Sequence, residues 1–259
     1  MKRQNIRKAM MVVAVLSLPV TMFYLSPLLT VQGAARGIVT SSLLFVGLAA
    51  AASFVLGRVF CGWLCPGGAV QELLFPANDR RLKGGRPDLI KYGLATLWLM
   101  AIAALFIRAG GLRVSPLFGI EGGVSLGSRT SYVMFFTAMG GMVALSLLAG
   151  RRPFCRYGCL LAPFMIAGKC TSRAVGSPRL RLAADGERCI HCMLCTKNCP
   201  MSIDVHAMVQ GNAMESPECI SCGACVDSCP KDVLSFAFSS GRKPSLPERR
   251  SSGEGQTMP

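Results

Sequence analysis

The sequence predicts an all-α membrane domain of four transmembrane helices, arranged as two repeated hairpins, followed by a small cysteine-rich α+β domain. Three observations support this. Four long uncharged apolar runs lie before residue 150, a short cysteine motif occurs twice in the same region, and two four-cysteine runs lie near the C-terminus. The 259-residue chain is also 51% hydrophobic with a formal net charge of +15. That combination is unusual for a water-soluble protein of this length.

The apolar runs are the first element to justify. They cover residues 10–29, 37–57, 92–107 and 131–149. A helix needs about 20 apolar residues to cross a bilayer, and three of the runs are near or above that length. The third is extended by Leu89, Ile90 and Tyr92, with the Lys91 ammonium expected to reach the membrane interface. A cleaved signal peptide is the alternative for the first run, but the run is long for that role.

The basic residues predict the orientation of these spans. The segments before the first run, between the second and third, and from the end of the fourth run to residue 181 carry 4, 6 and 7 Lys or Arg, whereas the other two loops carry 1 and 3. Positive charge concentrates on the cytoplasmic side of bacterial membranes. We therefore expect a multi-pass inner-membrane protein that contacts lipid, with both termini and all thirteen cysteines cytoplasmic. Because the basic residues lie in the loops between the apolar runs, they do not indicate nucleic-acid binding.

Each predicted hairpin ends in the motif Arg-x-Phe-Cys-x-aromatic-x-Cys, at residues 58–65 and 152–159. If the backbone is helical, cysteines four residues apart lie on one face. The repetition predicts one shared redox or metal site made by Cys61, Cys65, Cys155 and Cys159. Such thiolates suit an iron–sulfur cluster, copper(I) or zinc. Ordinary buried cysteines are the alternative.

Basic residues flank these thiols. Arg58, Arg152 and Arg156 are expected to lower the pKa values of the neighbouring cysteines and to favour thiolate.

Both C-terminal runs read Cys-x2-Cys-x2-Cys-x3-Cys-Pro, at residues 189–200 and 219–230. Bacterial two-cluster ferredoxins hold two [4Fe–4S] clusters with this pattern, and the fourth cysteine of each run ligates the other cluster. The first cluster is therefore assigned to Cys189, Cys192, Cys195 and Cys229. The second is assigned to Cys219, Cys222, Cys225 and Cys199. Zinc sites usually use shorter cysteine pairs, and a reducing cytoplasm disfavours disulfides.

The expected organisation is a membrane domain over 1–159, a basic interfacial linker over 160–181, a ferredoxin-like domain over 182–238 and a disordered tail over 239–259. Both histidines, His191 and His206, lie in the ferredoxin-like domain. The spans therefore offer no histidine, and a haem between them is not expected. Cys170 has no partner at motif spacing, and Glu121, in an outer loop, is a candidate contact for a quinol hydroxyl.

Taken together, these motifs resemble those of the polyferredoxin-like membrane proteins, which include NapH, MauN and the C-terminal part of NosR-type proteins. The resemblance is carried by Phe60-Cys61-Gly-Trp-Leu-Cys65-Pro66 and by residues 152–159, and it extends over about 10–238. Leu160 departs from the proline usual there in the family. The resemblance implies four membrane helices, two cytoplasmic Cys-x3-Cys-Pro motifs, a two-cluster domain, and a role in electron transfer or metalloenzyme maturation.

Three functional hypotheses follow. The first is a membrane-anchored carrier that passes electrons between the quinone pool or cytoplasmic donors and a partner redox protein. The second is an assembly factor that handles metal for a partner metalloenzyme complex. It would bind the metal through the membrane-edge cysteines, which are Cys61, Cys65, Cys155 and Cys159. The third is a membrane redox sensor. The sequence contains no nucleophile–base set, Walker motif or dinucleotide fingerprint, so any catalysis would be redox. It leaves open whether the protein is a carrier or a subunit of a quinol-linked oxidoreductase.

Overall fold

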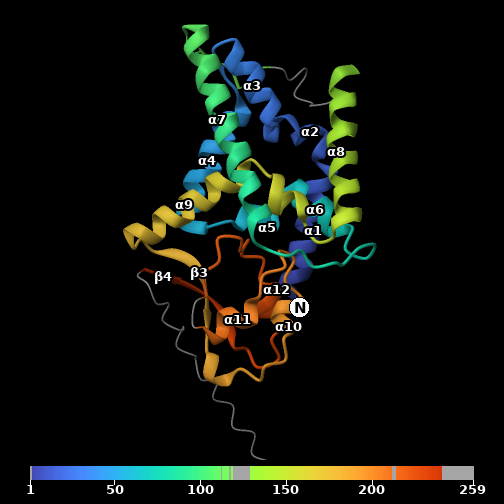
Figure 1. The fold of residues 1–259 in the computed structure, drawn as a ribbon, viewed down its shortest axis with the longest axis vertical. Coiled ribbons are helices and arrows are strands. Elements are labelled where there is room, and N and C mark those ends of the chain that lie inside the picture. Colours follow the sequence, from blue (N-terminus) through green and yellow to red (C-terminus); the bar gives the residue numbers. More distant parts are fainter. Residues whose placement is uncertain (1, 112, 117, 119–128, 212–213, 241–259) are drawn as a thin grey trace, which may run out of the picture.

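The computed structural model describes residues 2–111, 113–116, 118, 129–211 and 214–240. A helical bundle occupies one end of the molecule and the cysteine-rich module the other (Figure 1). Two predictions lie outside the described residues, namely the role of Glu121 and the disorder of the tail from residue 241 onward.

The first apolar run does not form one helix. It is divided among α1 (Lys2–Leu16), α2 (Leu18–Thr21), a 3-10 turn η1 (Phe23–Leu25) and α3 (Pro27–Ala35). Prolines stand in the first turns of α2 and α3. Proline lacks an N–H and clashes with the preceding helical turn, so a helix cannot run unbroken through Pro19 and Pro27.

The second run is bent. It comprises α4 (Ser41–Leu56), α5 (Val59–Trp63) and α6 (Pro66–Leu73), and α4 meets the α5–α6 pair at 98°. Gly57 absorbs the bend at φ +62, a conformation that favours glycine. A 3-10 turn η2 (Arg86–Leu89) leads into α7 (Ile90–Ala109), and α8 (Arg129–Ala149) is the last long helix.

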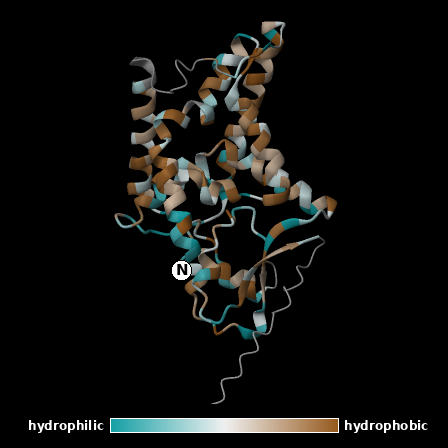
Figure 2. Cartoon of the chain, turned by 180° about the vertical axis from the view of Figure 1, so that it is seen from behind, coloured by the Kyte–Doolittle hydropathy of each residue, from teal (hydrophilic) through white to brown (hydrophobic). Residues whose placement is uncertain are grey.

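Length and composition identify which helices can cross a membrane. Among the described residues, Arg86–Ala109 and Tyr132–Ala149 are long and apolar enough, and a third span is added if the bent pair counts as one. In the view of Figure 2, apolar residues alternate along these helices with residues of intermediate hydropathy. The structure thus has two or three candidate spans where the sequence predicts four.

The bundle is held together by pairwise helix packing. α3 packs on α7 around Ala34, Trp98 and Ile102, and the short strands β1 (Ile38–Val39) and β2 (Arg113–Val114) pair in parallel at one end. α9 (Leu161–Val175) packs along α4, where a Cβ on Gly168 would lie 2.0 Å from Ser53 Oγ. α8 contacts α6 and the segment 154–158, and the rest of this helix stands apart from the bundle (Figure 1).

The cysteine-rich module is the predicted small α+β unit. Strand β3 (Arg179–Ala184) pairs antiparallel with β4 (Leu234–Ser239), so that Ala184 lies opposite Leu234. Between them lie a 3-10 turn η4 (Gly186–Arg188) and helices α10 (Leu194–Lys197), α11 (Val205–Gln210) and α12 (Ala224–Asp227). The expected linker over 160–181 is thus mostly α9, and the expected boundary at 182 falls inside β3.

The two halves of this module share one backbone conformation. Positive φ angles occur in pairs thirty residues apart, at His191 and Ser221 (54° and 52°) and at Met193 and Gly223 (61° and 76°). Ser202 and Asp232 form a third pair, at 56° and 49°. The two cysteine runs therefore fold into equivalent loops.

Candidate metal centres

The first predicted ligand set lines one cavity. Cys189, Cys192 and Cys195 come from the first run, and Cys229 reaches the same cavity from the second. Apolar side chains, including Val209, Val233 and Leu234, complete the wall.

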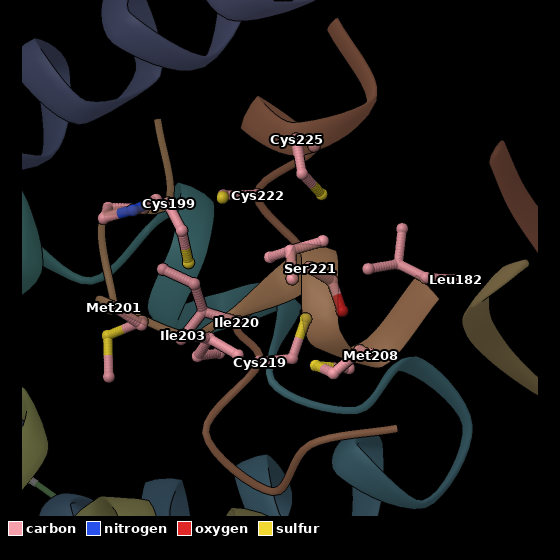
Figure 3. A pocket seen from close by; sticks show the side chains of 13 residues that line it. Leu182, Cys199, Met201, Ile203, Met208, Cys219, Ile220, Ser221, Cys222 and Cys225 are labelled. Atoms are coloured by element: carbon pink, nitrogen blue, oxygen red, sulfur yellow. The ribbon is translucent and has the colours of Figure 1, made fainter. Parts of the chain in front are cut away.

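The second set lines another cavity in the same way. Cys219, Cys222 and Cys225 come from the second run, and Cys199 from the first. Figure 3 shows their sulfur atoms arranged around one space. Each cavity is thus lined by three cysteines of one run and the last cysteine of the other, and the assignment of these sets to two clusters stays a prediction.

The donor set of the second cavity fits an iron–sulfur cluster. The backbone N–H groups of Met201 and Ile203 hydrogen-bond the Cys199 thiol, and that of Ala224 hydrogen-bonds Cys222. Burial raises the pKa of the Cys222 thiol to about 12. Four thiolates, three of them buried, would repel one another without positive charge between them. A cationic iron cluster supplies that charge, and N–H groups directed at its sulfurs are a usual part of such sites.

The four membrane-edge cysteines form two matching pairs. Cys61 lies in α5 and Cys155 in a short π-helix, η3 (Phe154–Gly158), and both are buried. Cys65 and Cys159 follow with almost the same extended backbone, φ −70 and ψ 115 against φ −72 and ψ 116. The sequence repeat is therefore a structural repeat, although the second cysteine of each pair lies beyond its short helix rather than on a continuous helical face.

These four thiols converge. Cys65 lies within electrostatic range of the other three, and its thiol interacts with the backbone N–H of Gly68, just as Cys159 interacts with that of Ala162. Gln71 Nε2 donates to Cys155 Sγ at 3.1 Å. Each second cysteine is thus contacted by the first turn of the helix that follows it, α6 or α9.

The spacing of the thiols bears on what they hold. Among the described residues, the one group of three or more His, Cys, Asp or Glu ligand atoms within 4.8 Å of one another is Cys189, His191 and His206. No three of the membrane-edge sulfurs are that close. Sulfurs on a single tetrahedral ion would lie roughly 4 Å apart. The wider spacing favours a cluster over a single ion.

The flanking Arg152 and Arg58 lower the pKa of the Cys155 thiol, as predicted, but burial outweighs them. Burial raises the pKa of Cys155 more than Arg152 lowers it, so the expected net lowering is wrong for this thiol. Arg152 is itself buried and paired with Glu72, and its Nη1 donates to Cys61 O at 2.8 Å. Much of its charge is therefore neutralised by a carboxylate.

The membrane-edge thiols adjoin the second cavity, a contact that sequence reasoning missed. Trp63 Nε1 donates to Ser221 O at 3.1 Å, and a Cβ on Gly62 would lie 2.3 Å from Ile220 O. Cys61 and Cys155 also share one apolar core with the second-cavity cysteines. From the other side, Gln4 Nε2 of α1 donates to Cys222 O at 3.1 Å.

A buried ion cluster lies at the same junction between the helical bundle and the ferredoxin-like module. Glu218, next to Cys219, pairs with Arg58 at 3.1 Å and with Lys91. Lys169 Nζ donates to Ser216 O at 2.7 Å, so three basic residues of the helical bundle hold the segment that enters the second cavity. The expectation that Lys91 extends to the interface is wrong, since its side chain is 0% exposed. An acid of the ferredoxin-like module lies within its reach instead.

The remaining candidates are more exposed. His191 and Cys170 lie at the surface, Cys170 on α9. His191 nevertheless has a partner, because its Nδ1 lies 3.0 Å from His206 Nε2.

Two protein-family models match the chain. One, described as a 4Fe-4S binding domain, matches residues 38–84 and 131–164 and so covers both membrane-edge cysteine pairs. The other, described as a 4Fe-4S dicluster domain, matches residues 181–230 and covers all eight ferredoxin-type cysteines. No solved structure matches the chain at a comparable level of significance.

Curated relatives point the same way. The chain is similar to the methylamine utilization ferredoxin-type protein MauN of Methylorubrum extorquens, with 27% identity over 67% of this chain and 59% of MauN. It is 26% identical to YccM of Escherichia coli, provisionally named an electron transport protein, over 63% and 47%. It is 34% identical to the regulatory protein NosR of Stutzerimonas stutzeri over 46% and 18%. The matched stretch spans roughly half the length of most of these relatives.

Proposed function

Because this chain belongs to the NapH/MauN/NosR-like family of ferredoxin-type proteins, we propose that it is a membrane-anchored electron carrier with three centres in series. The two domain matches and the ferredoxin-type relatives make it an iron–sulfur electron-transfer protein. To this we add the membrane anchor, the order of the centres and a link to quinone.

The first two centres are [4Fe–4S] clusters, which supply reversible one-electron chemistry when bound. Cys189, Cys192, Cys195 and Cys229 hold the first, and Cys219, Cys222, Cys225 and Cys199 the second. The protein keeps the second away from water, since Cys199, Cys222 and Cys225 are buried. The first is nearer to solvent, because Cys192 is exposed and Ile190 and Met193 beside it are 54% and 44% exposed.

The third centre is the membrane-edge cysteine set, for which we propose a further iron–sulfur cluster. The 4Fe-4S domain match over both pairs and the wide sulfur spacing support this assignment. The four residues are Cys61, Cys65, Cys155 and Cys159.

The contact of Gly62 with Ile220 and Cys222 carries the proposed order of the centres. It brings the loop of the second cavity directly against the turn that holds Cys61. Electron transfer weakens steeply with distance, so adjacent packing favours exchange between these two sites. The exposed first cavity is then the side at which a partner redox protein exchanges electrons.

The helices support a membrane anchor. Two single helices meet the length and apolarity of a membrane span, and the bent pair adds a third. The N-terminal end of α1 lies against the ferredoxin-like module, where Arg3 pairs with Asp227, so both lie at one end of the bundle. With the loop charges, this supports a bacterial inner-membrane protein with the module in the cytoplasm. A quinol in the lipid would then meet the membrane-edge cysteines first.

A reductant experiment tests the quinone link. The full chain, purified anaerobically in detergent, is mixed with a reduced quinol analogue while the visible absorption of its clusters is followed. We expect partial bleaching by quinol and full bleaching by dithionite. Bleaching by dithionite alone would remove quinol from the proposed function.

An iron count tests the third centre. Three cubanes give about twelve irons per chain, and two give about eight. The double variant Cys61→Ser/Cys155→Ser should lose about four irons. Cys170→Ser, a change at an exposed cysteine outside the three sets, serves as the matched control and should lose none. Equal iron in the wild type and the double variant would refute the third centre.

A further inference from the structure

The only two histidines of the chain lie together beside the first cavity. They are 15 residues apart in sequence, yet His191 Nδ1 and His206 Nε2 are 3.0 Å apart. Cys189 Sγ completes a group of three ligand atoms that all lie within 4.8 Å of one another. In the part of the chain that the structure describes, this is the one such group.

The position of His206 is fixed by its helix. His206 N–H donates to Thr196 Oγ1 at 2.8 Å, and Asp204 caps the start of α11. Thr196 is itself 2% exposed, so the anchor is buried. His191 extends from the loop of the first cysteine run at φ 54. The two rings therefore face each other from a fixed helix and a loop at the surface, each with a nitrogen able to bind a metal.

The second cavity has no equivalent of this pair. The residues thirty positions on are Ser221 and Phe236, although Ser221 repeats the backbone conformation of His191. The imidazoles are therefore not needed to build a four-cysteine cavity of this shape.

We propose that Cys189, His191 and His206 form a site for a borderline-soft divalent cation such as Zn²⁺, on the solvent side of the first cluster. Zinc takes imidazole nitrogen at about 2.0–2.1 Å and thiolate sulfur at about 2.3 Å, often with water in a fourth position. A ligand spacing under 4.8 Å permits this with small movements of the rings. Cys189 is then shared between the cluster and the cation.

The site gives zinc a specific effect on electron transfer. The inference rests on the proposed function in that it needs the first cluster to be present. A divalent cation held by Cys189 adds positive charge at one cluster ligand and stabilises the added electron. The reduction potential of the first cluster therefore rises, while that of the second, which has no such site, stays unchanged. The cation thereby regulates electron exchange at the exposed end of the protein.

Zinc titration of the intact, cluster-loaded chain tests this. Zinc sulfate is added anaerobically, bound zinc is measured after dialysis, and both clusters are titrated by EPR-monitored potentiometry. We expect one zinc per chain and a positive shift of the first cluster alone. His191→Ala and His206→Ala should each abolish the binding and the shift. Glu187→Gln, a change at an exposed acid two residues before Cys189, is the control and should keep both.

Several results would overturn the site. These are no shift in the wild type, an equal shift of both clusters, a shift that persists in the histidine variants, or loss of the first cluster on zinc addition. The zinc X-ray absorption spectrum of the wild type is an independent readout, and a shell of oxygen donors alone would also refute the site. If the first-cluster signal is missing before any zinc is added, the proposed function fails instead.

Discussion

Gly62 lies so close to Ile220 that no side chain fits between them, since a Cβ on Gly62 would lie 2.3 Å from the carbonyl oxygen of Ile220. The contact joins the turn that carries Cys61 to the loop that carries Cys222. A backbone oxygen cannot move aside as the end of a flexible side chain can. The contact at Gly62 therefore determines how closely the bundle and the ferredoxin-like module approach each other.

Gly62→Ala should separate the two parts. We expect a cost of about 1–3 kcal/mol from overpacking and weaker magnetic coupling between the second cluster and the membrane-edge centre. The coupling is measured as line broadening in EPR spectra of the reduced protein. Gly93→Ala, a change in α7 where a new Cβ meets no atom within 4 Å, is the control and should leave the spectrum unchanged. Identical spectra for the two variants would show that the contact does not set the coupling.

The ion cluster around Glu218 gives a second test of the junction. Glu218→Gln leaves two buried cations, Arg58 and Lys91, without their carboxylate. Removing one partner of a buried pair typically costs about 3–5 kcal/mol. We expect a lower temperature for loss of cluster absorption on heating. Asp79→Asn breaks a pair with Arg151 whose carboxylate is 60% exposed, and it should cost less than about 1 kcal/mol.

A double variant separates charge from packing at this cluster. Lys91→Met in the Glu218→Gln background removes one of the two unpaired cations, so part of the lost stability should return. If Lys91→Met lowers the melting temperature further instead, the lysine stabilises the junction through its packing and not through its charge.

Because the ligand sets are crossed, serine variants of Cys199 and Cys229 are expected to damage different clusters. Cys199→Ser should damage the cluster of Cys219, Cys222 and Cys225, and Cys229→Ser the cluster of Cys189, Cys192 and Cys195, because the fourth ligand comes from the other run. EPR distinguishes the clusters once Cys192→Ser and Cys222→Ser have identified the signal of each. Loss of the first cluster in Cys199→Ser, with the second intact, would contradict the crossed arrangement.

The ferredoxin-like module could be predicted from sequence because its constraints are local. The spacing of the cysteines follows from the size of the cluster they surround, and the same spacing brings Cys199 and Cys229 into opposite cavities. The repeated backbone at Cys65 and Cys159 was likewise visible as a repeated motif.

The junction could not be predicted in this way. Lys91 and Glu218 are 127 residues apart, and nothing near either one indicates the other. A lysine at the end of an apolar run is ordinarily expected to extend toward water, and only the fold shows that an acid lies closer. Pro19 and Pro27 did indicate a break in the first run, but a prediction from the length of the apolar run alone does not take prolines into account.

The last prediction concerns one backbone position that the two cluster loops fill differently. Met193 has φ 61, whereas Gly223 has φ 76 at the equivalent position. This conformation costs a residue with a side chain about 1–2 kcal/mol, whereas it costs glycine almost nothing. Met193→Gly should therefore leave the first cluster as stable as before to within about 1 kcal/mol, because relief of strain offsets the greater freedom of glycine in the unfolded chain.

Gly223→Ala should behave differently, because it adds strain and a contact. The new Cβ would lie 3.2 Å from Phe236 Cε2 and 3.3 Å from Arg3 Nε, and so would press on the side chain that pairs with Asp227. We expect the second cluster to be lost to an iron chelator at least about tenfold faster than in the wild type, which corresponds to about 1.4 kcal/mol. The measurement is the anaerobic decay of each cluster's EPR signal in both variants. Faster loss of the first cluster in Met193→Gly than of the second in Gly223→Ala would mean that the cover Met193 gives its cavity outweighs the backbone strain.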